Sequence, residues 1–401
     1  MNEKGFDKLR VFILALGHMV NDCYSNMIPP LLPVLRTTYD LSYAASGMIM
    51  TVFTITSSII QPVFGYYADR KGRRWLVALS VLWTGFFMSM IGIIGFLDLD
   101  SSGAYIVILA LVGLSGFGSA SYHPQASTMV PRISGDHKGL GVSIFSAGGN
   151  LGYAIMPLLV VPVTSLWGIQ GTLVLFIPAL IASLLLQRYA PEPPSSSVAL
   201  NLKELWSDIM AVAKPLSIVT GVVCMRAWLF FGLITFLPLY FAYRQEPPEM
   251  ASLHLFILLF FGATGSLIGG HVSDRYGRKF TIVFSLLFTG PLLFAALYIN
   301  GLMQWVLMAA AGMSLLASFS PAVLIAQGLI PKNQGIASGI ILGFAIGVGG
   351  LGVVVTGAVS DAFGITVGIF SLVALPVIGL LLALLLPGKI RPEIVGVRYV
   401  K

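Results

Sequence analysis

The sequence GYYADRKGRR at residues 65–74 returns 205 positions later as GHVSDRYGRK at residues 270–279. Both stretches keep a glycine, then an Asp-Arg pair, then a Gly-Arg pair at the same spacing. Further along, the spacing shortens to 200, and glycines such as Gly149 and Gly349 occupy matching positions. Internal similarity at this distance predicts a duplicated unit, each copy filling about half of the 401 residues.

The composition places both copies in a membrane. Hydrophobic residues make up 57% of the chain and charged residues 10%, and the mean hydropathy is +0.91, all outside the range of soluble domains. A helix needs about 20 apolar residues to cross the hydrocarbon core. We therefore predict an all-α membrane protein with twelve transmembrane helices in two pseudo-symmetric six-helix bundles. The apolar runs lie near residues 9–34, 43–68, 75–97, 103–130, 138–163, 168–188, 213–241, 250–273, 280–299, 302–330, 334–360 and 365–387.

Three parts are expected along the chain. Residues 1–190 form the first bundle, 191–212 a cytoplasmic linker, and 213–401 the second bundle. The linker begins with PEPPSSS, and Asn201 with Glu204 makes a capping box at the start of a short helix. The apolar residues of that helix share one face, which predicts that it lies on the membrane interface.

The basic residues predict the orientation. If both termini share one side, all but three of the 23 Lys and Arg lie there, the exceptions being Arg36, Arg226 and Arg244. Cytoplasmic loops carry this excess, so both termini are expected in the cytoplasm. The formal charge of +7 then meets lipid headgroups, and we expect no nucleic-acid partner. Cys23 and Cys224 lie inside helices, which favours neither a disulfide framework nor a metal site.

The repeated motif also places an aspartate beside several basic residues at the end of a helix. An aspartate at the cytoplasmic end of a helix is disfavoured by the helix dipole, so it needs a cationic neighbour or another helix N-terminus. The motif, twice in a twelve-helix chain, resembles the signature loop of the major facilitator superfamily. The resemblance implies that Asp69 and Arg73 clasp the cytoplasmic gate in the outward-facing state; the alternative is a basic loop that only fixes topology. The gating candidates are Gly65, Asp69, Arg70, Gly72, Arg73, Asp274, Arg275 and Arg278.

A narrower resemblance covers most of the first half. HMVNDCYSNMIPPLLP from His18, SGFGSASYHPQAS from Ser115, GLGVSIFSAGGNLGYAIMPLL from Gly139 and TFLPLYF after Arg226 resemble the fosmidomycin-resistance branch of that superfamily. The resemblance implies a proton-driven exporter in the prokaryotic inner membrane. That branch typically has a glutamate after His-Pro, where this chain has Gln125. A carboxylate that carries protons elsewhere in the branch cannot do so here.

The first apolar run carries a polar stripe. On a helix, His18, Asn21 and Asp22 face one direction. An ionisable group at mid-membrane costs about 2.5 to 3.5 kcal/mol on insertion scales and normally faces the bundle interior. At the offset of 205, Arg226 of the seventh helix aligns with Asn21, so the two copies deliver opposite charges at about the same depth. We expect them to converge between the halves, where carriers of this kind bind their substrates.

The site chemistry favours an anionic or phosphonate-like substrate. A guanidinium such as that of Arg226 matches carboxylate and phosphate oxygens; the competing interpretation is that Asp22 and Arg226 simply neutralise one another. On the fourth helix, Pro124 leaves a carbonyl unpaired beside Ser119 and His123, which predicts a hydrated cavity. The proton-coupling candidates are Asp22, His18 and His123. The substrate-binding candidates are Arg226, Asn21, His123, Ser119, Asn150, Tyr153 and Gln125.

Three functions remain open. The first is a proton-coupled antiporter that exports a small, anionic drug or metabolite by alternating access, and the second is a symporter that imports an organic anion with protons. The third is a membrane-embedded enzyme, for which His18, Asp22 and His123 would be the ligands. The chain has no H-E-x-x-H, Walker or G-x-S-x-G motif, so we expect no enzyme, no cofactor and a proton gradient as the energy source. Each protein molecule, with both halves together, would enclose its own pathway, so a monomer is expected.

Overall fold

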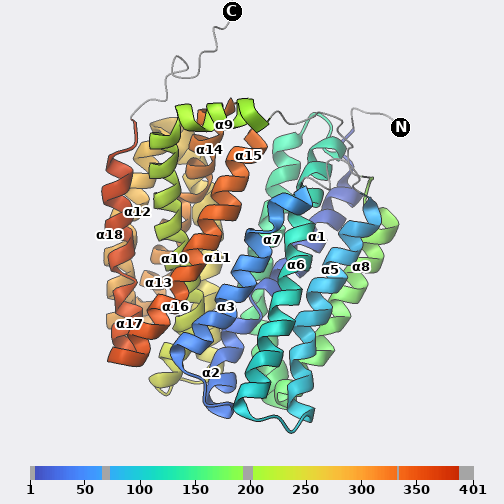
Figure 1. The fold of residues 1–401 in the computed structure, drawn as a ribbon, viewed down its shortest axis with the longest axis vertical. Helices are drawn as coiled ribbons and strands as arrows, with labels where there is room; N and C mark the ends of the chain where they lie inside the picture. The colour runs from blue at the N-terminus through green and yellow to red at the C-terminus, as the bar shows by residue number, and fades with distance from the viewer. Residues whose placement is uncertain (1–4, 66–72, 193–201, 332–333, 388–401) are drawn as a thin grey trace, which may run out of the picture.

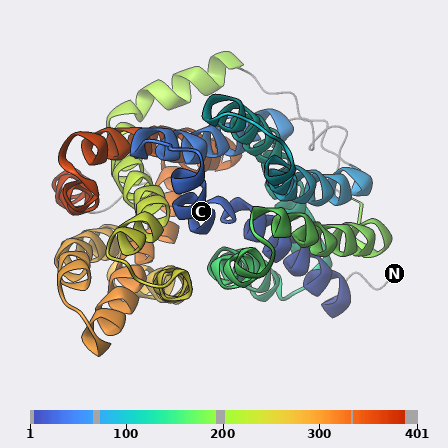
Figure 2. The ribbon, with the colours of Figure 1, turned by 90° about the horizontal axis from the view of Figure 1, so that it is seen from below.

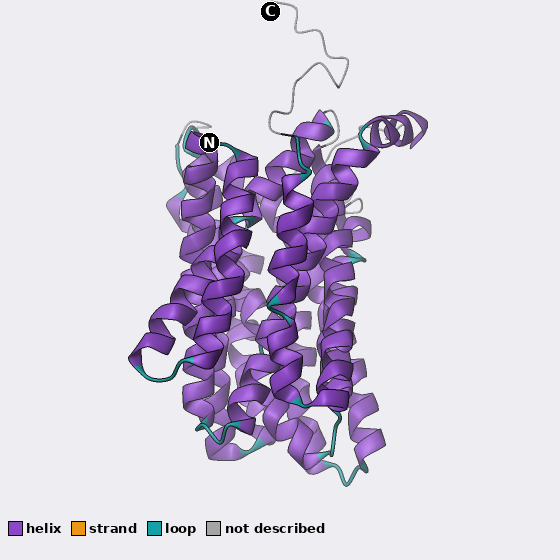
Figure 3. Cartoon of the chain, turned by 90° about the vertical axis from the view of Figure 1, so that its left-hand side faces the viewer, coloured by secondary structure: helices purple, strands orange, loops and turns teal. Residues whose placement is uncertain are grey.

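The computed structural model is a bundle of long helices that run between two ends of the molecule (Figure 1). The structure describes residues 5–65, 73–192, 202–331 and 334–387. In this part of the chain, all regular structure is helical (Figure 3). Eleven of its helices are long and apolar enough to cross a membrane. Together α1 (Lys8–Ser25) and α2 (Ile28–Thr38) form one further crossing, which confirms the predicted twelve-helix fold.

The other crossings follow in the predicted order. The first group continues with α3 (Tyr43–Ser58), α5 (Arg74–Ser89) with η1 (Met90–Phe96), α6 (Ser101–Ile133), α7 (Lys138–Trp167), and η2 (Ile169–Leu175) with α8 (Phe176–Tyr189). The second group contains α10 (Ala213–Tyr243), α11 (Pro248–Tyr276), α12 (Arg278–Tyr298), α13 (Leu302–Ala317) with α14 (Phe319–Leu329), α15 (Gln334–Gly339) with η4 (Ile340–Ala345) and α16 (Ile346–Phe363), and α17 (Ile365–Ser371) with α18 (Ala374–Leu384).

The two ends of the bundle differ in charge. The end where α1 begins and α18 ends is the upper one in Figure 1. We call it the basic end, because three helices start there with a basic residue in their first turn: Arg74 in α5, Lys138 in α7 and Lys279 in α12. The opposite end, which carries Asp40 and Asp100 in its loops, is called the distal end.

The helices before α9 and those after it form two groups when viewed from the distal end (Figure 2). The groups meet where α3 packs on α16, α7 on α11, and α2 on α10. In the α3–α16 contact, Thr51 Oγ1 donates a hydrogen bond to the Gly350 carbonyl at 2.8 Å. A Cβ at Gly350 would collide with Thr54, so a glycine is needed for the two helices to approach this closely.

The linker helix α9 (Leu202–Ala211) is present as predicted. Its side chains Trp206 and Met210 are exposed at the basic end. Because large apolar side chains favour the headgroup region over water, this surface agrees with an interfacial position. The capping pair Asn201 and Glu204 falls outside the residues whose side chains the structure describes.

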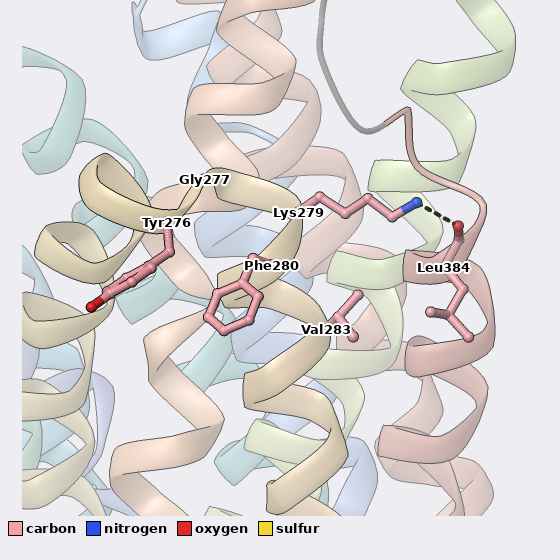
Figure 4. Close-up of a pocket in the computed structure, with 6 residues that line it drawn as sticks. All are labelled: Tyr276, Gly277, Lys279, Phe280, Val283 and Leu384. Carbon is pink, nitrogen blue, oxygen red and sulfur yellow. Dashed lines mark hydrogen bonds between the residues drawn. The ribbon is translucent and has the colours of Figure 1, made fainter.

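The last crossing is tied to α12 at the basic end. Figure 4 shows the Lys279 side chain reaching over the end of α18, past a surface pocket lined by Tyr276 and Phe280. Its Nζ donates to the carbonyls of Leu384 at 2.7 Å and Leu386 at 2.6 Å. Carbonyls at a helix C-terminus lack helical donors, so this lysine satisfies them and complements the helix dipole.

The first crossing is broken at Asn26, between α1 and α2. Pro29 and Pro30 begin α2 and have no N–H to continue the ladder of α1. The buried Asn26 side chain donates from Nδ2 to the Tyr153 carbonyl on α7 at 2.7 Å. That carbonyl would normally accept from residue 157, which is proline. One irregularity therefore supplies the hydrogen bond that the other removes.

Asn26→Ala is expected to destabilise the protein by about 1 to 3 kcal/mol, because the Tyr153 carbonyl is left buried without a donor. Pro157→Ala restores a backbone N–H to that carbonyl, so the same Asn26 change should cost less in a Pro157→Ala background. Thermal unfolding of the four proteins in detergent measures both costs. Equal losses in the two backgrounds would show that the compensation does not exist.

Candidate functional site

A buried carboxylate lies at the centre of the first group of helices. Asp22 on α1 is 6% exposed, and its two oxygens face two histidines. Oδ2 lies 3.2 Å from Nε2 of His18, one turn earlier on α1, and Oδ1 lies 3.4 Å from Nε2 of His123 on α6. The predicted stripe on the first helix and the predicted face of the fourth helix therefore meet at Asp22.

The contact between His18 and Asp22 holds a single proton. Nδ1 of His18 lies 2.7 Å from the backbone carbonyl of Phe145 on α7, and the two rings stack at 4.1 Å. A carbonyl oxygen only accepts hydrogen bonds, so Nδ1 carries a proton and Nε2 is the nitrogen that can gain or lose one. The Nε2–Oδ2 contact is attractive only when one proton lies between the two atoms. The pair is then either imidazolium with carboxylate or imidazole with carboxylic acid.

Asn21 orients the other side of the carboxylate. Its Nδ2 donates to Asp22 Oδ1 at 3.1 Å and lies 3.3 Å from Ser119 Oγ. The contact with Asp22 sets the orientation of the amide, because a flipped amide would place its own oxygen against the carboxylate; Thr84 Oγ1 on α5 lies 3.1 Å from Asn21 Oδ1 on the other side. Sequence reasoning missed Thr84, since a threonine in an apolar helix commonly bonds its own backbone, as this one also does to Ser80.

His123 is the accessible edge of the cluster. Its side chain is 29% exposed, against 12% for His18 and 8% for Asp22. Ser119 Oγ lies 3.4 Å from its Nε2, so polar groups continue along α6. His123 is therefore the most accessible of the three side chains.

Arg226 on α10 is a buried cation without a counter-charge. It is 4% exposed, and its Nε has no hydrogen-bond partner. Its guanidinium carbon lies 4.9 Å from the ring centroid of Phe319, at the start of α14. No ion pair to Arg226 occurs within the described part of the chain, and Asp22 is bound by histidines instead. The interpretation that Asp22 and Arg226 neutralise one another therefore has no support in this structure.

The remaining predicted binding residues do not contact the Asp22 carboxylate directly. Tyr153 on α7 lies between the two groups, since its hydroxyl forms a hydrogen bond with the Ser25 side chain on α1 and its ring lies 6.2 Å from that of Phe230. Asn150 is half-buried, and among the described residues it makes no hydrogen bond. Gln125 is 1% exposed and donates to the Ser121 carbonyl and hydroxyl at 3.0 Å, within its own helix. The structure thus shows Gln125 in helix packing and not in the Asp22 cluster.

The predicted gate is described in part, since Asp69, Arg70 and Gly72 lie outside the described residues. Gly65 is the last described residue before them, and Arg73 is exposed at the start of α5. In the second copy, Gly277 has a φ of +99°, as a tight turn requires. Arg278 donates to the Leu324 carbonyl at 2.8 Å and Arg275 lies over Tyr276, whereas Asp274 is exposed. The gating role stays a prediction.

The two imidazoles and the carboxylate also form a donor set that transition metals accept, with donor atoms within 4.8 Å of one another. This is the set that the enzyme hypothesis would use. Hydrogen bonds account for the contacts of His18 and Asp22, so the geometry does not call for an ion between them.

Comparison with known proteins identifies the family. The sequence profile of the Major Facilitator Superfamily matches residues 14–351. The chain belongs to this superfamily. As a major facilitator it is a multi-pass membrane transporter, and this family is not an enzyme family.

Two relatives and one solved structure extend the comparison. This major facilitator is 32% identical to the uncharacterized transporter YfnC of Bacillus subtilis, over 94% of this chain and 92% of the relative. It is 30% identical to the fosmidomycin resistance protein of Escherichia coli, over 92% of this chain and 90% of the relative. A bacterial homolog of the human lysosomal transporter spinster, in an inward-facing and occupied conformation, has the same fold, with a TM-score of 0.80, 17% identity, and coverage of 96% of this chain and 97% of that one.

Gly149→Ala is expected to break the cluster of this major facilitator. A Cβ there would collide with the His18 ring and the Asp22 carboxylate, whereas a Cβ at Gly139 on the same helix meets nothing within 4 Å. Overpacking costs about 1 to 3 kcal/mol, while Gly→Ala in a helix otherwise gains up to about 1 kcal/mol. Thermal unfolding should therefore show Gly149→Ala destabilised and Gly139→Ala neutral or stabilised. Equal stability of the two variants would show that His18 and Asp22 do not pack against Gly149.

Proposed function

We propose that this major facilitator is a proton-coupled antiporter that exports a small organic anion by alternating access. The positive-inside rule makes the basic end cytoplasmic, so both termini lie in the cytoplasm. Export as the direction rests on the similarity to a fosmidomycin resistance protein, which covers 92% of this chain. The substrate class and the coupling ion rest on the two buried charges.

The observation that carries the proposal is the unpaired guanidinium of Arg226. An uncompensated buried charge costs several kcal/mol, and only a small part of that is returned by the ring of Phe319. A carboxylate or phosphonate that arrives between the halves supplies the missing counter-charge, and the planar fork of Arg226 binds two of its oxygens at once. A neutral compound supplies no counter-charge, and a cationic compound is repelled by this residue.

The Asp22 cluster supplies the proton site. The cluster is buried, shares one proton between His18 and Asp22, and has an accessible edge at His123. A group with these properties can take up a proton from one side of the membrane and release it to the other. For antiport, the anion and the proton occupy the protein in different states, the anion when the basic end is open and the proton when the distal end is open.

One observation favours the symporter as a second candidate. With its shared proton the cluster is neutral, so Arg226 leaves the centre with a net charge of +1 that attracts an anion. Loss of the proton cancels this charge. Proton and anion then assist each other's binding, as co-transport requires.

The two candidates separate in vesicles whose outer surface carries the basic end. An acid interior drives uptake of labelled fosmidomycin in an antiporter, whereas an acid exterior drives it in a symporter. Asp22→Asn should lower the rate of gradient-driven uptake at least about tenfold, because removing a side chain that transfers protons commonly lowers the rate by this factor or more. Asp98→Asn, the same chemical change at an exposed loop position, should leave uptake unchanged.

Normal gradient-driven uptake by Asp22→Asn would contradict the role of this residue. Uptake that no pH gradient alters in the wild type would contradict proton coupling. Thermal unfolding of each variant shows whether a loss of uptake comes from misfolding.

A further inference from the structure

A carboxylate links the two groups of helices at the distal end. Asp361, near the end of α16, accepts hydrogen bonds from two backbone N–H groups at the start of α3. The Tyr43 N–H donates to Oδ1 at 2.7 Å and the Ala44 N–H to Oδ2 at 2.9 Å. The residues are separated by more than 300 positions in the chain and belong to different groups.

These bonds complete the cap of α3. The first N–H groups of a helix have no helical acceptor. Here Ser42 Oγ accepts from the Ala45 N–H at 3.0 Å, which leaves Tyr43 and Ala44 to be satisfied by Asp361. The negative charge also lies at the positive end of the helix dipole. The N-terminus of α3 is thus capped half by its own chain segment and half by the other group of helices.

The backbones are shaped for this contact. Gly357 lies one turn before Asp361, and a Cβ there would collide with the backbone of Tyr43 and Ala44. Any larger residue would hold α16 away from the end of α3 and lengthen both hydrogen bonds. Arg36 on α2 lies 4.0 Å over the ring of Tyr43, which fixes this segment from the other side.

We infer that Asp361 is a latch that holds the distal end closed. Opening of that end separates α3 from α16, so the carboxylate and both N–H groups must exchange their bonds for water. The contact is exposed, so its strength is moderate, as a latch that opens in every cycle requires. The inference rests on the alternating access in the proposed function, but on neither its substrate nor its coupling ion.

A matched control lies at the same end of the molecule. Asp100 Oδ1 accepts from the Gly103 N–H at 2.9 Å and caps α6, which belongs to the same group of helices as Asp100 itself. Removing this cap affects a helix end but no contact between the groups. Asp361 and Asp100 therefore test the same chemistry with and without a role in closure.

The experiment measures the opening directly. Spin labels are attached after Thr38→Cys and Val367→Cys, two exposed positions in different groups, in full-length protein with Cys23→Ala and Cys224→Ala. Pulsed electron paramagnetic resonance then gives the distribution of label distances. Asp361→Ala should raise the ratio of long to short distances about fivefold, the size expected for loss of one helix cap. Asp361→Asn, which keeps one acceptor and no charge, should fall between wild type and Asp361→Ala.

Asp100→Ala should leave the distances unchanged. An unchanged distribution in Asp361→Ala, or an equal change in Asp100→Ala, would overturn the latch. Circular dichroism of each labelled protein confirms that the helices are intact. The label distances do not depend on which proton or anion is bound. A transport result that contradicts the role of Asp22 would therefore leave this test unaffected.

Discussion

A charge placed inside a bilayer must find a partner within the protein, and this requirement organises the centre of the molecule. Asp22 meets it twice, through His18 and His123. Arg226 meets it only through the face of an aromatic ring. Because the described chain supplies a partner for one charge and not for the other, the proposed function gives the two residues different roles. In that proposal the Asp22 cluster binds the proton and Arg226 binds the substrate anion.

The scaffold places these groups through its irregularities more than through its regular helices. The break at Asn26 and the proline at position 157 together hold α1 against α7. Gly149 then lets the His18 ring and the Asp22 carboxylate lie directly against α7, where the Phe145 carbonyl selects the tautomer of His18. Each of these features costs some helix stability, and each is offset by a contact that brings the cluster together.

The sequence predicts the membrane crossings, the polar stripe of the first helix, and the helix face that carries Ser119 and His123. It can do so because hydropathy and helical spacing are local properties of the chain. The sequence does not predict the partner of Asp22, since that depends on how far α1 and α6 rotate about their axes when they pack. The aligned positions of Asn21 and Arg226 suggested a pair that the structure does not contain. The role of Phe145 has no sequence signal at all, because it is made by a backbone carbonyl.

The most direct test of the account asks whether Arg226 is the binding site for an anion. Thermal unfolding is measured with fosmidomycin and other organic phosphonates and carboxylates, each paired with its uncharged ester. An acid should raise the unfolding midpoint of the wild type by about 2 to 5 °C at saturating concentration. The ester should leave that midpoint unchanged, and Arg226→Met, stable without ligand, should respond to neither compound. An equal response of Arg226→Met and wild type to the acid, or of the wild type to acid and ester, would contradict the account.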